Sequence, residues 1–214
     1  MDMKRHWETV YLNNPSAGVS WFQPSAARSL DLISRVGSDL TIPIIDVGGG
    51  ASVLVDDLLH ASYSNITVLD LSGAAIATAR ARLGADATRV QWLEADVLTV
   101  LLPRATYGIW HDRALFHFLT DEADRAAYVA QVRHAVRPGG YALMSTFAAD
   151  GPTQCSGLEV SRYSPASLLQ EFGAGFDLVA AAEDEHVTPS GARQAFIYCL
   201  FRWNGDAKST AFGG

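Results

Sequence analysis

The hydrophobic pattern alternates between two periods from residue 41 onward. Short runs rich in Ile, Val and Leu predict strands over residues 41–47, 65–70, 89–93, 107–111, 141–147, 176–182 and 194–203. Segments with apolar positions three or four residues apart predict helices over 52–60, 73–83 and 121–136, and Ser164-Pro165 starts another. Alternating strands and helices, followed by two successive strands, predict an α/β fold. We expect a doubly wound sheet of seven strands, mostly parallel, with an antiparallel C-terminal hairpin.

The chain is long enough to form a full core, with 214 residues of which 49% are hydrophobic. We expect one core domain over residues 39–203, preceded by an N-terminal helical cover of the active site over residues 1–38. Residues 204–214 are expected to form a flexible tail. No uncharged apolar run approaches the length needed to cross a membrane, so we expect no membrane partner and a cytoplasmic location.

Charge and lysine content argue against several classes of function. The net charge of −7 disfavours a nucleic-acid partner, because binding phosphates requires a clustered basic face. Lysine occurs only at Lys4 and Lys208. The core therefore holds no lysine for a Schiff base, a P-loop or a Tyr-x-x-x-Lys dehydrogenase pair.

The two cysteines form neither a Cys-x-x-Cys pair nor a metal-binding spacing. Cys199 lies in an apolar run and is expected to be buried and inert. Cys155 lies in a polar, Gly-rich stretch where a thiol can be exposed. Nothing else supplies enough ligands to complete a site with His111, Asp112 and His117, so we predict no metal.

Acidic residues stand at or just beyond the ends of four predicted strands: Asp46, Asp70, Asp96 and Asp112. In an open α/β sheet the ligand lies across the carboxyl ends of the strands, so we expect these acids to converge on one crevice. Each acid alone is equally compatible with a helix cap or a solvated loop. The glycines at 48–50 let backbone N–H groups approach a ligand, and Asp70 can accept both hydroxyls of a ribose. The combination predicts an adenosine-bearing cofactor.

The glycine spacing discriminates between nucleotides. A dinucleotide site requires G-x-G-x-x-G/A, so that a pyrophosphate can lie on the helix N-terminus. Here Gly48 and Gly50 are followed by Val53 at the third small position. A nicotinamide-dependent oxidoreductase therefore stays only as an alternative.

Four motifs, taken in order, resemble a known family. Asp46-Val47-Gly48-Gly49-Gly50 is similar to the first motif of class I S-adenosylmethionine-dependent methyltransferases, with Ser52 replacing the common third glycine. Asp70 matches the family's ribose acid, Ala95-Asp96-Val97 its adenine motif, and Arg137-Pro138-Gly139-Gly140 the turn before its fifth strand. The resemblance covers about residues 40 to 150 and implies a Rossmann-like sheet.

The resemblance implies a site for S-adenosylmethionine, which leaves as S-adenosylhomocysteine. The implied contacts of the core, from the methionine end to the adenine end, are Asp46, Gly48, Gly49, Gly50, His111, Asp70, Leu71, Asp96 and Val97. Asp46 would orient the amino group, and the backbone at His111 would line the reactive end. Asp96 would accept the adenine amino group.

The aromatic residues before the sheet resemble the N-terminal cover of small bacterial-type methyltransferases, including the thiopurine, tellurite-resistance and protein-lysine types. In one interpretation Tyr11, Trp21 and Phe22 close over the cofactor's sulfonium and the acceptor. In the other, Trp7 and Trp21 only seal the N-terminal helices onto the core.

Residues 110–118 follow the fourth strand, where this family presents side chains to the acceptor. We propose Asp112, Arg113 and His117 as catalytic candidates and Phe116 as an acceptor contact. Arg113 would hold an anionic acceptor and His117 would take its proton. The alternatives are an Asp112–Arg113 ion pair and a His117 that only packs.

The loop after the fifth strand adds Cys155, Arg162 and Tyr163 as acceptor contacts. Glu183, Glu185 and His186 are expected to be solvated at the last hairpin turn. The sequence thus predicts methyl transfer by in-line displacement to a nucleophile on a small molecule. A protein lysine methyltransferase is the first alternative.

Overall fold

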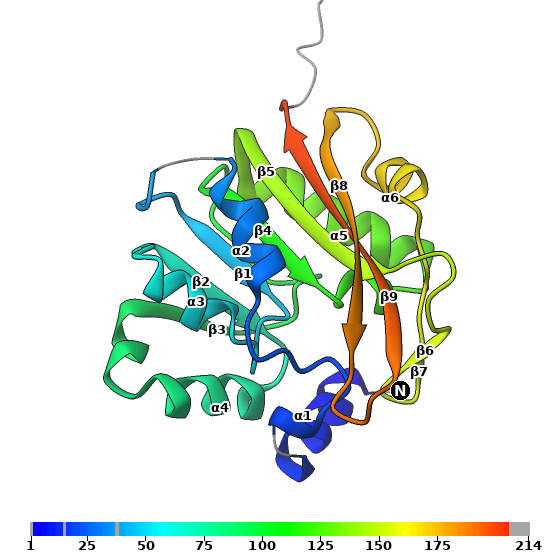
Figure 1. The fold of residues 1–214 in the computed structure, drawn as a ribbon. Helices are drawn as coiled ribbons and strands as arrows, with labels where there is room; N and C mark the ends of the chain where they lie inside the picture. The colour runs from blue at the N-terminus through cyan, green and yellow to red at the C-terminus, as the bar shows by residue number, and fades with distance from the viewer. Residues whose placement is uncertain (1, 15, 37–38, 206–214) are drawn as a thin grey trace, which may run out of the picture.

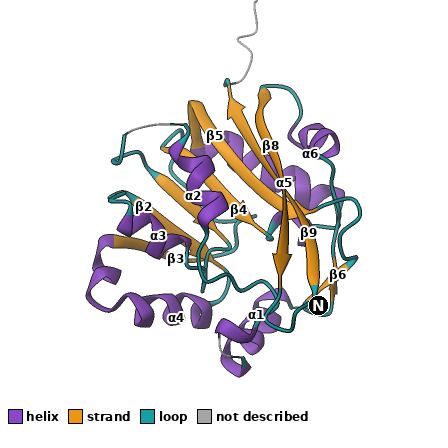
Figure 2. Cartoon of the chain, viewed as in Figure 1, coloured by secondary structure: helices purple, strands orange, loops and turns teal. Residues whose placement is uncertain are grey.

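The computed structural model describes residues 2–14, 16–36 and 39–205. Residues 206–214 of the predicted tail, and residues 1, 15, 37 and 38 of the predicted cover, lie outside the described residues. A seven-stranded sheet forms the centre of the molecule, and helices cover both of its faces (Figures 1 and 2). Its strands are β1 Ile44–Val47, β2 Ile66–Asp70, β3 Val90–Glu94, β4 Tyr107–Arg113, β5 Val136–Phe147, β8 Phe176–Val187 and β9 Arg193–Trp203.

The helices are α1 Met3–Asn13, α2 Ala27–Ser34, α3 Leu54–His60, α4 Gly73–Leu83, α5 Glu122–Ala135 and α6 Pro165–Phe172. Short 3₁₀ turns are η1 Ser16–Gly18, η2 Gly84–Arg89 and η3 Phe116–Phe118. Strands β6 Gln154–Cys155 and β7 Leu158–Glu159 form a small hairpin after β5. Ser72 accepts a hydrogen bond from the backbone of Ala75 and caps α4, and Ser164 caps α6. Both serines therefore start the helices that the sequence assigns to them.

The strand order is β3-β2-β1-β4-β5-β9-β8. Strands β1 to β5 pair in parallel, whereas β9 is antiparallel to both of its neighbours. The predicted fold class is confirmed. Strands β2 and β3 are added on one side of β1, and β4 and β5 on the other side. The strand order therefore reverses between β1 and β4, and open α/β sheets bind ligands at such a switch point.

The core divides into two layers, one on each face of the sheet. One layer contains Trp110, Tyr128 of α5 and Phe172 of α6. The other contains Ile33 of α2 and Leu58 of α3. Because both faces are covered, the central strands β1 and β2 are buried along their whole length, as a parallel sheet requires.

The largest differences from the predicted boundaries are in β5 and β8, which each extend five residues further. Strand β5 begins at Val136, so the Arg137–Gly140 segment lies inside the strand rather than before it. Gly139 has a φ of +82°, and the pairing with β4 shifts register beside it, so glycine absorbs the irregularity. Strand β8 continues to Val187 and places His186 in the strand.

His186 is buried, which corrects the expectation that it is solvated. Its Nε2 donates to the carbonyl oxygen of Ser20 at 2.7 Å, and burial lowers its pKa. Glu183 and Glu185 do lie exposed along the same strand. The β8–β9 hairpin thus reaches the N-terminal segment, which the turn signals alone did not indicate. Among the described residues, no helix is long and apolar enough to span a bilayer.

Candidate active site

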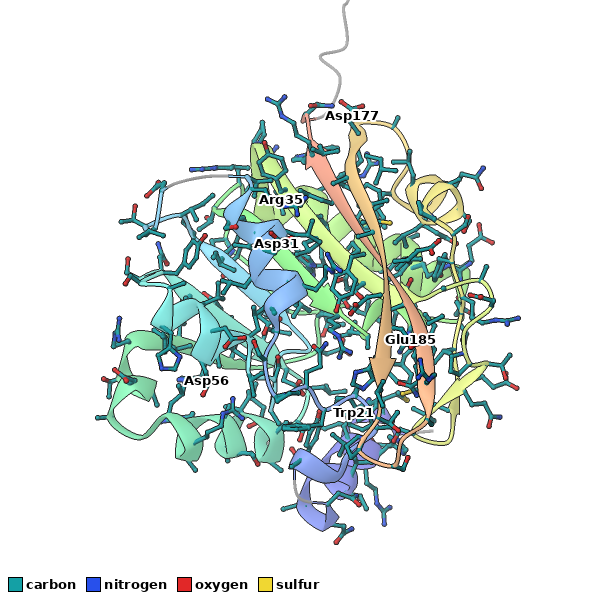
Figure 3. All side chains as sticks on the ribbon, in the orientation of Figure 1. Trp21, Asp31, Arg35, Asp56, Asp177 and Glu185 are labelled. Atoms are coloured by element: carbon teal, nitrogen blue, oxygen red, sulfur yellow. The ribbon has the colours of Figure 1, made fainter. Side chains whose placement is uncertain are left out.

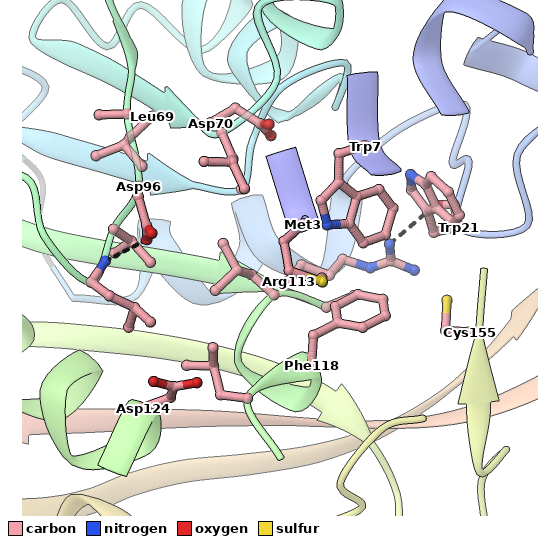
Figure 4. Close-up of a pocket in the computed structure, with 18 of the residues that line it drawn as sticks. Met3, Trp7, Trp21, Leu69, Asp70, Asp96, Arg113, Phe118, Asp124 and Cys155 are labelled. Atoms are coloured by element: carbon pink, nitrogen blue, oxygen red, sulfur yellow. Dashed lines mark hydrogen bonds between the residues drawn. The ribbon is translucent and has the colours of Figure 1, made fainter. Parts of the chain in front are cut away.

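Two adjoining cavities lie at the carboxyl ends of β1, β2 and β4. The first has a volume of about 350 Å³. Its lining includes Met3, Trp7, Tyr11, Trp21, Gly48, Asp70, Leu71, Asp96, Val97, Arg113, Phe118, Asp124 and Cys155 (Figure 4). The second, of about 50 Å³, shares Tyr11, Trp21, Gly48 and Arg113 with the first and adds Phe22, Asp46, Gly49 and His111.

Asp70 is held rigidly at the wall of the first cavity. Its Oδ2 accepts from the backbone of Gly50 at 2.9 Å, and its Oδ1 accepts from the backbone of Ser72 at 2.8 Å. A Cβ at Gly50 would lie 2.6 Å from Asp70 Oδ2 and 2.5 Å from the Ala75 Cβ, so only glycine fits there. Burial raises the pKa of Asp70 to about 6. The carboxylate is still largely ionised at neutral pH and can accept further hydrogen bonds.

The far end of the first cavity is formed by the residues after β2 and β3. Leu71, Val97 and Leu98 supply apolar surface there. Asp96 Oδ1 accepts from the backbone of Leu98 at 2.9 Å, which fixes the turn that carries the acid. Asp124 of α5 also lines the first cavity. The sequence analysis did not predict it, because it belongs to none of the cofactor motifs.

Asp46 belongs to a buried chain of three side chains at the second cavity. Its Oδ1 lies 2.6 Å from His111 Nδ1, and His111 Nε2 lies 2.8 Å from Ser29 Oγ. The other carboxylate oxygen, Oδ2, is buried and has no hydrogen-bond partner. A Cβ at Gly49 would lie 2.3 Å from this oxygen, so the missing side chain makes room for the carboxylate. Sequence reasoning predicted Asp46 and His111 but not Ser29.

Aromatic rings form the wall opposite the strand ends. The Trp7 ring lies 5.7 Å from that of Trp21 and 5.0 Å from that of Phe118, edge to face in both pairs. Trp21 Nε1 donates to the Tyr11 hydroxyl at 3.2 Å, and Trp21 lies beside α1 (Figure 3). Met3, Trp7 and Tyr11 recur every four residues, which places them on one face of α1. That spacing was the available signal for Met3 and Trp7.

The N-terminal cover is attached to the core by polar contacts. Glu8 accepts from the backbone N–H groups of Gly73 at 2.6 Å and Ala74 at 3.3 Å, at the start of α4. Lys4 pairs with Glu94 at 2.6 Å at the surface. Further along, His186 holds Ser20, as described above. The cover is therefore fixed over the cavity from several core elements.

Arg113 points across the first cavity toward Trp21 and Cys155 (Figure 4). Its Nε donates to the Tyr198 hydroxyl at 3.1 Å and its Nη1 to the Trp21 carbonyl at 3.1 Å. The guanidinium lies 4.7 Å from the centroid of the Phe196 ring. Nη2 is buried without a hydrogen-bond partner. The predicted alternative, an ion pair between Arg113 and Asp112, is not formed.

Asp112 corrects the expectation that four acids converge on the crevice. It lies inside β4, is fully buried and lines neither cavity. Its carboxylate accepts from the Tyr128 hydroxyl at 2.5 Å and from the backbone of Leu115 and Phe116. Its place in β4 turns it toward α5, and there it holds the turn that follows β4 instead of reaching a ligand.

His117 is also fully buried and lines neither cavity. Its ring lies 4.5 Å from that of Phe118 and 4.7 Å from that of Phe147, and burial lowers its pKa to about 3. A neutral imidazole packed in this way is not placed to take a proton from an acceptor. The packing alternative therefore describes His117.

The remaining acceptor candidates divide between the cavities and the core. Cys155 lines the first cavity but is buried, and burial raises the pKa of its thiol to about 11. Phe116 and Tyr163 are buried in the α5–α6 layer. Arg162 donates to the carbonyl of Gly151 at 3.2 Å and lines neither cavity. Cys199 is fully buried in β9, as predicted.

Residues 44–140 match the protein family described as a methyltransferase domain. This match, together with the seven-stranded fold, supports the resemblance to the class I S-adenosylmethionine-dependent methyltransferases. The matched segment ends just before Tyr141, where β5 resumes its regular pairing with β4. It therefore includes the strand ends that carry Asp46, Asp70 and Asp96. The assignment leaves the oxidoreductase alternative without support. Among the described residues, no group of three or more His, Cys, Asp or Glu side chains is placed to hold a metal ion.

The proteins similar to this chain are described with different kinds of acceptor. Human EEF1A lysine methyltransferase 2 is 23% identical over 190 residues, which cover 82% of this chain and 75% of that protein. A structure from work on the conversion of a disulfide bond into a thioacetal group during echinomycin biosynthesis has a TM-score of 0.75 at 20% identity, covering 97% of this chain and 95% of the other.

A third relative comes from Burkholderia thailandensis. Its 1,6-didemethyltoxoflavin-N1-methyltransferase, bound to 1,6-didemethyltoxoflavin and S-adenosylhomocysteine, has a TM-score of 0.66 at 18% identity, covering 95% of this chain and 84% of that one. At such identities the likeness to solved structures establishes the fold.

Proposed function

We propose that this methyltransferase transfers a methyl group to a nucleophile on a small molecule, by in-line displacement. The observation that carries the proposal is that aromatic side chains of the N-terminal cover form one wall of the first cavity. Trp7, Tyr11 and Trp21 wall a space of about 350 Å³. This volume lies at the lower end of the range for small-molecule sites, and a nucleoside cofactor takes up much of it.

The residues present fit S-adenosylmethionine. Asp70 lies at the end of β2 with an ionised carboxylate suited to ribose hydroxyls, and Asp96 with Leu71 and Val97 suits an adenine ring. The second cavity is lined by two side chains that each keep a buried polar atom without a partner, Asp46 Oδ2 and Arg113 Nη2. One is anionic and the other cationic, so together they complement the ammonium and carboxylate groups of a methionine moiety.

The acceptor end of the first cavity is formed by Trp21, Arg113 and Cys155, with Phe118 beside them (Figure 4). When bound, S-adenosylmethionine supplies a methyl group on a positively charged sulfur. The aromatic faces of Tyr11 and Trp21 stabilise positive charge, and the aromatic wall shields that side of the cavity from water.

The described residues of the acceptor end offer no base of suitable pKa. Burial raises the pKa of Tyr11 well above its usual value and that of Cys155 to about 11. The guanidinium of Arg113 offers hydrogen-bond donors and no acceptor. The protein therefore contributes positioning and a dry, charged environment, and the acceptor must be nucleophilic when it enters.

Labelled methyl transfer tests the proposal. The purified protein is incubated with methyl-labelled S-adenosylmethionine and with either the small-molecule or the protein fraction of a lysate. We expect label in the small-molecule fraction, and we expect Asp70→Ala to reduce it at limiting cofactor concentration. Label found solely in protein would contradict the proposed acceptor class, and no transfer to either fraction would count against the activity itself.

A protein lysine acceptor is the second candidate. It is favoured by the similarity to EEF1A lysine methyltransferase 2 and, more weakly, by the net charge of −7. A polypeptide would have to reach the cavity past α1 and residues 16–22, which are attached to the core through Glu8 and His186. Transfer to protein that increases in Glu8→Gln, where the attachment of α1 is weakened, would support this candidate.

A further inference from the structure

We infer that His111 is a positioning residue for the amino group of the cofactor, acting through Asp46, and that Ser29 in turn holds the imidazole. The inference rests on the proposed function, which places the methionine moiety in the second cavity. The three side chains come from three elements: Asp46 from β1, His111 from β4 and Ser29 from α2. They form one continuous hydrogen-bonded chain.

The side chains of Asp46, His111 and Ser29 are buried, so they must satisfy their hydrogen bonds with one another. The exposed fraction is 2% for Asp46, 2% for His111 and 1% for Ser29, so water does not compete for their hydrogen bonds. The distances are 2.6 Å between His111 Nδ1 and Asp46 Oδ1, and 2.8 Å between His111 Nε2 and Ser29 Oγ. Within the part of the chain that is described, no lysine or arginine pairs with Asp46.

The hydrogen bonds determine where each proton lies. An ionised carboxylate only accepts, so His111 Nδ1 carries the proton and donates it to Asp46 Oδ1. In the neutral imidazole, Nε2 then accepts from the Ser29 hydroxyl. In this arrangement the His111 ring occupies Asp46 Oδ1. Asp46 Oδ2, which has no partner, is the atom left to receive a cation.

A ligand ammonium group in the second cavity would lie next to Asp46 Oδ2. Asp46 and His111 both line it, together with Gly48 and Gly49. Oδ2 lies against the backbone of Gly49, where any side chain would clash at 2.3 Å. The His111 hydrogen bond on Oδ1 and the Gly49 backbone beside Oδ2 therefore set the rotation of the carboxylate. Without the imidazole, the carboxylate can rotate and the ammonium loses a preorganised acceptor.

Two ligands separate this role from a general effect on the fold. S-Adenosylhomocysteine carries the amino acid moiety, whereas 5′-methylthioadenosine lacks it and keeps the adenosine and sulfur. In His111→Phe, which retains a ring of similar size, we expect the affinity for S-adenosylhomocysteine to fall about tenfold. Binding of 5′-methylthioadenosine should stay within about twofold of the unmodified protein, as measured by calorimetry.

Two milder variants should each cause a smaller loss of S-adenosylhomocysteine affinity than His111→Phe. His111→Asn keeps a side-chain N–H near the position of Nδ1 and should restore most of the affinity that His111→Phe loses. Ser29→Ala removes only the distal hydrogen bond and should weaken S-adenosylhomocysteine by about threefold, again sparing 5′-methylthioadenosine. These two variants keep the test valid if His111→Phe does not fold.

His134→Phe is the matched control. His134 also bonds through its ring, with Nε2 3.0 Å from the Leu102 carbonyl, but lines neither cavity. It should leave both affinities unchanged. Equal losses for the two ligands in the His111 and Ser29 variants, or no loss for either, would overturn the positioning role. If the unmodified protein binds neither ligand, the proposed function fails first, and the inference fails with it.

Discussion

The two ends of the first cavity are built in different ways. The adenosine end uses Asp70, the last residue of β2, together with Leu71 after β2 and Asp96 after β3, all within one short stretch of sequence. The acceptor end combines Trp21 of the N-terminal cover, Arg113 of β4 and Cys155 of β6, which only the fold brings together. Residues close together in sequence therefore build the proposed adenosine end, whereas contacts between distant segments build the proposed acceptor end.

The largest effect is expected at Gly50, whose backbone N–H donates to Asp70 of the adenosine end. Gly50→Ala would place a methyl group 2.6 Å from Asp70 Oδ2 and 2.5 Å from Ala75 Cβ, so the loop or Asp70 must move. We expect S-adenosylhomocysteine affinity to fall by about 100-fold, measured by calorimetry. Ala85→Val adds bulk at an exposed position and should change nothing. Near-normal affinity in Gly50→Ala would show that the loop is not closely packed against the acid.

A smaller loss is expected when the acid itself is removed. Asp70→Ala deletes the acceptor for the ribose hydroxyls and should weaken S-adenosylhomocysteine by about 10- to 100-fold. Asp86→Ala removes an exposed carboxylate on η2 as the control. Unchanged affinity in a folded Asp70→Ala protein would remove Asp70 from the site and would end the distinction between the two ends of the cavity.

Trp21→Ala tests the acceptor end. Trp21 walls both cavities and contacts Tyr11 and Trp7, so its loss opens the cover. We expect kcat with a small-molecule acceptor to fall about tenfold, while S-adenosylhomocysteine affinity falls by less than about threefold. Leu12→Ala, at an exposed position of α1, should leave both unchanged. The reverse result, a large loss of affinity with normal kcat, would assign Trp21 to the cofactor.

The smallest effect is a pH dependence that belongs to the adenosine end alone. Burial raises the pKa of Asp70 from 3.8 to about 6, so its acceptor charge is present above this pH and lost as the pH falls through it. Affinity for S-adenosylhomocysteine should therefore decrease severalfold between about pH 7 and about pH 5. Asp70→Asn should flatten this profile.

The raised pKa of Asp70 should change the stability of the ligand-free protein in the opposite direction from its effect on ligand affinity, whereas the lowered pKa of His117 contributes stability that is lost as the pH falls. A carboxyl group whose folded pKa exceeds its unfolded value binds protons more readily in the folded state, so this contribution favours folding as the pH falls toward the unfolded pKa. Asp112, with a pKa also raised to about 6, adds to the same trend. Parallel losses of stability and affinity below pH 6 would mean that acid unfolding, not Asp70, causes the pH effect.

Residues that are close together in the sequence determined the secondary structure and part of the candidate site. The strands, the helices begun by Ser72 and Ser164, and the acids at Asp46, Asp70 and Asp96 follow from residues close together in sequence, because strand period, caps and tight turns depend on neighbours. The fold class and the adenosine end of the site were predictable for this reason.

The tertiary structure decided what each remaining side chain faces. Asp112 and His117 carry the chemistry of catalytic groups, yet the register of β4 and the packing of η3 direct them into the core. Ser29 and His186 gave no sequence signal, because their partners at His111 and Ser20 are far along the chain. Burial and hydrogen bonding between distant segments are properties of the assembled fold, and they alone determine which polar groups meet a ligand.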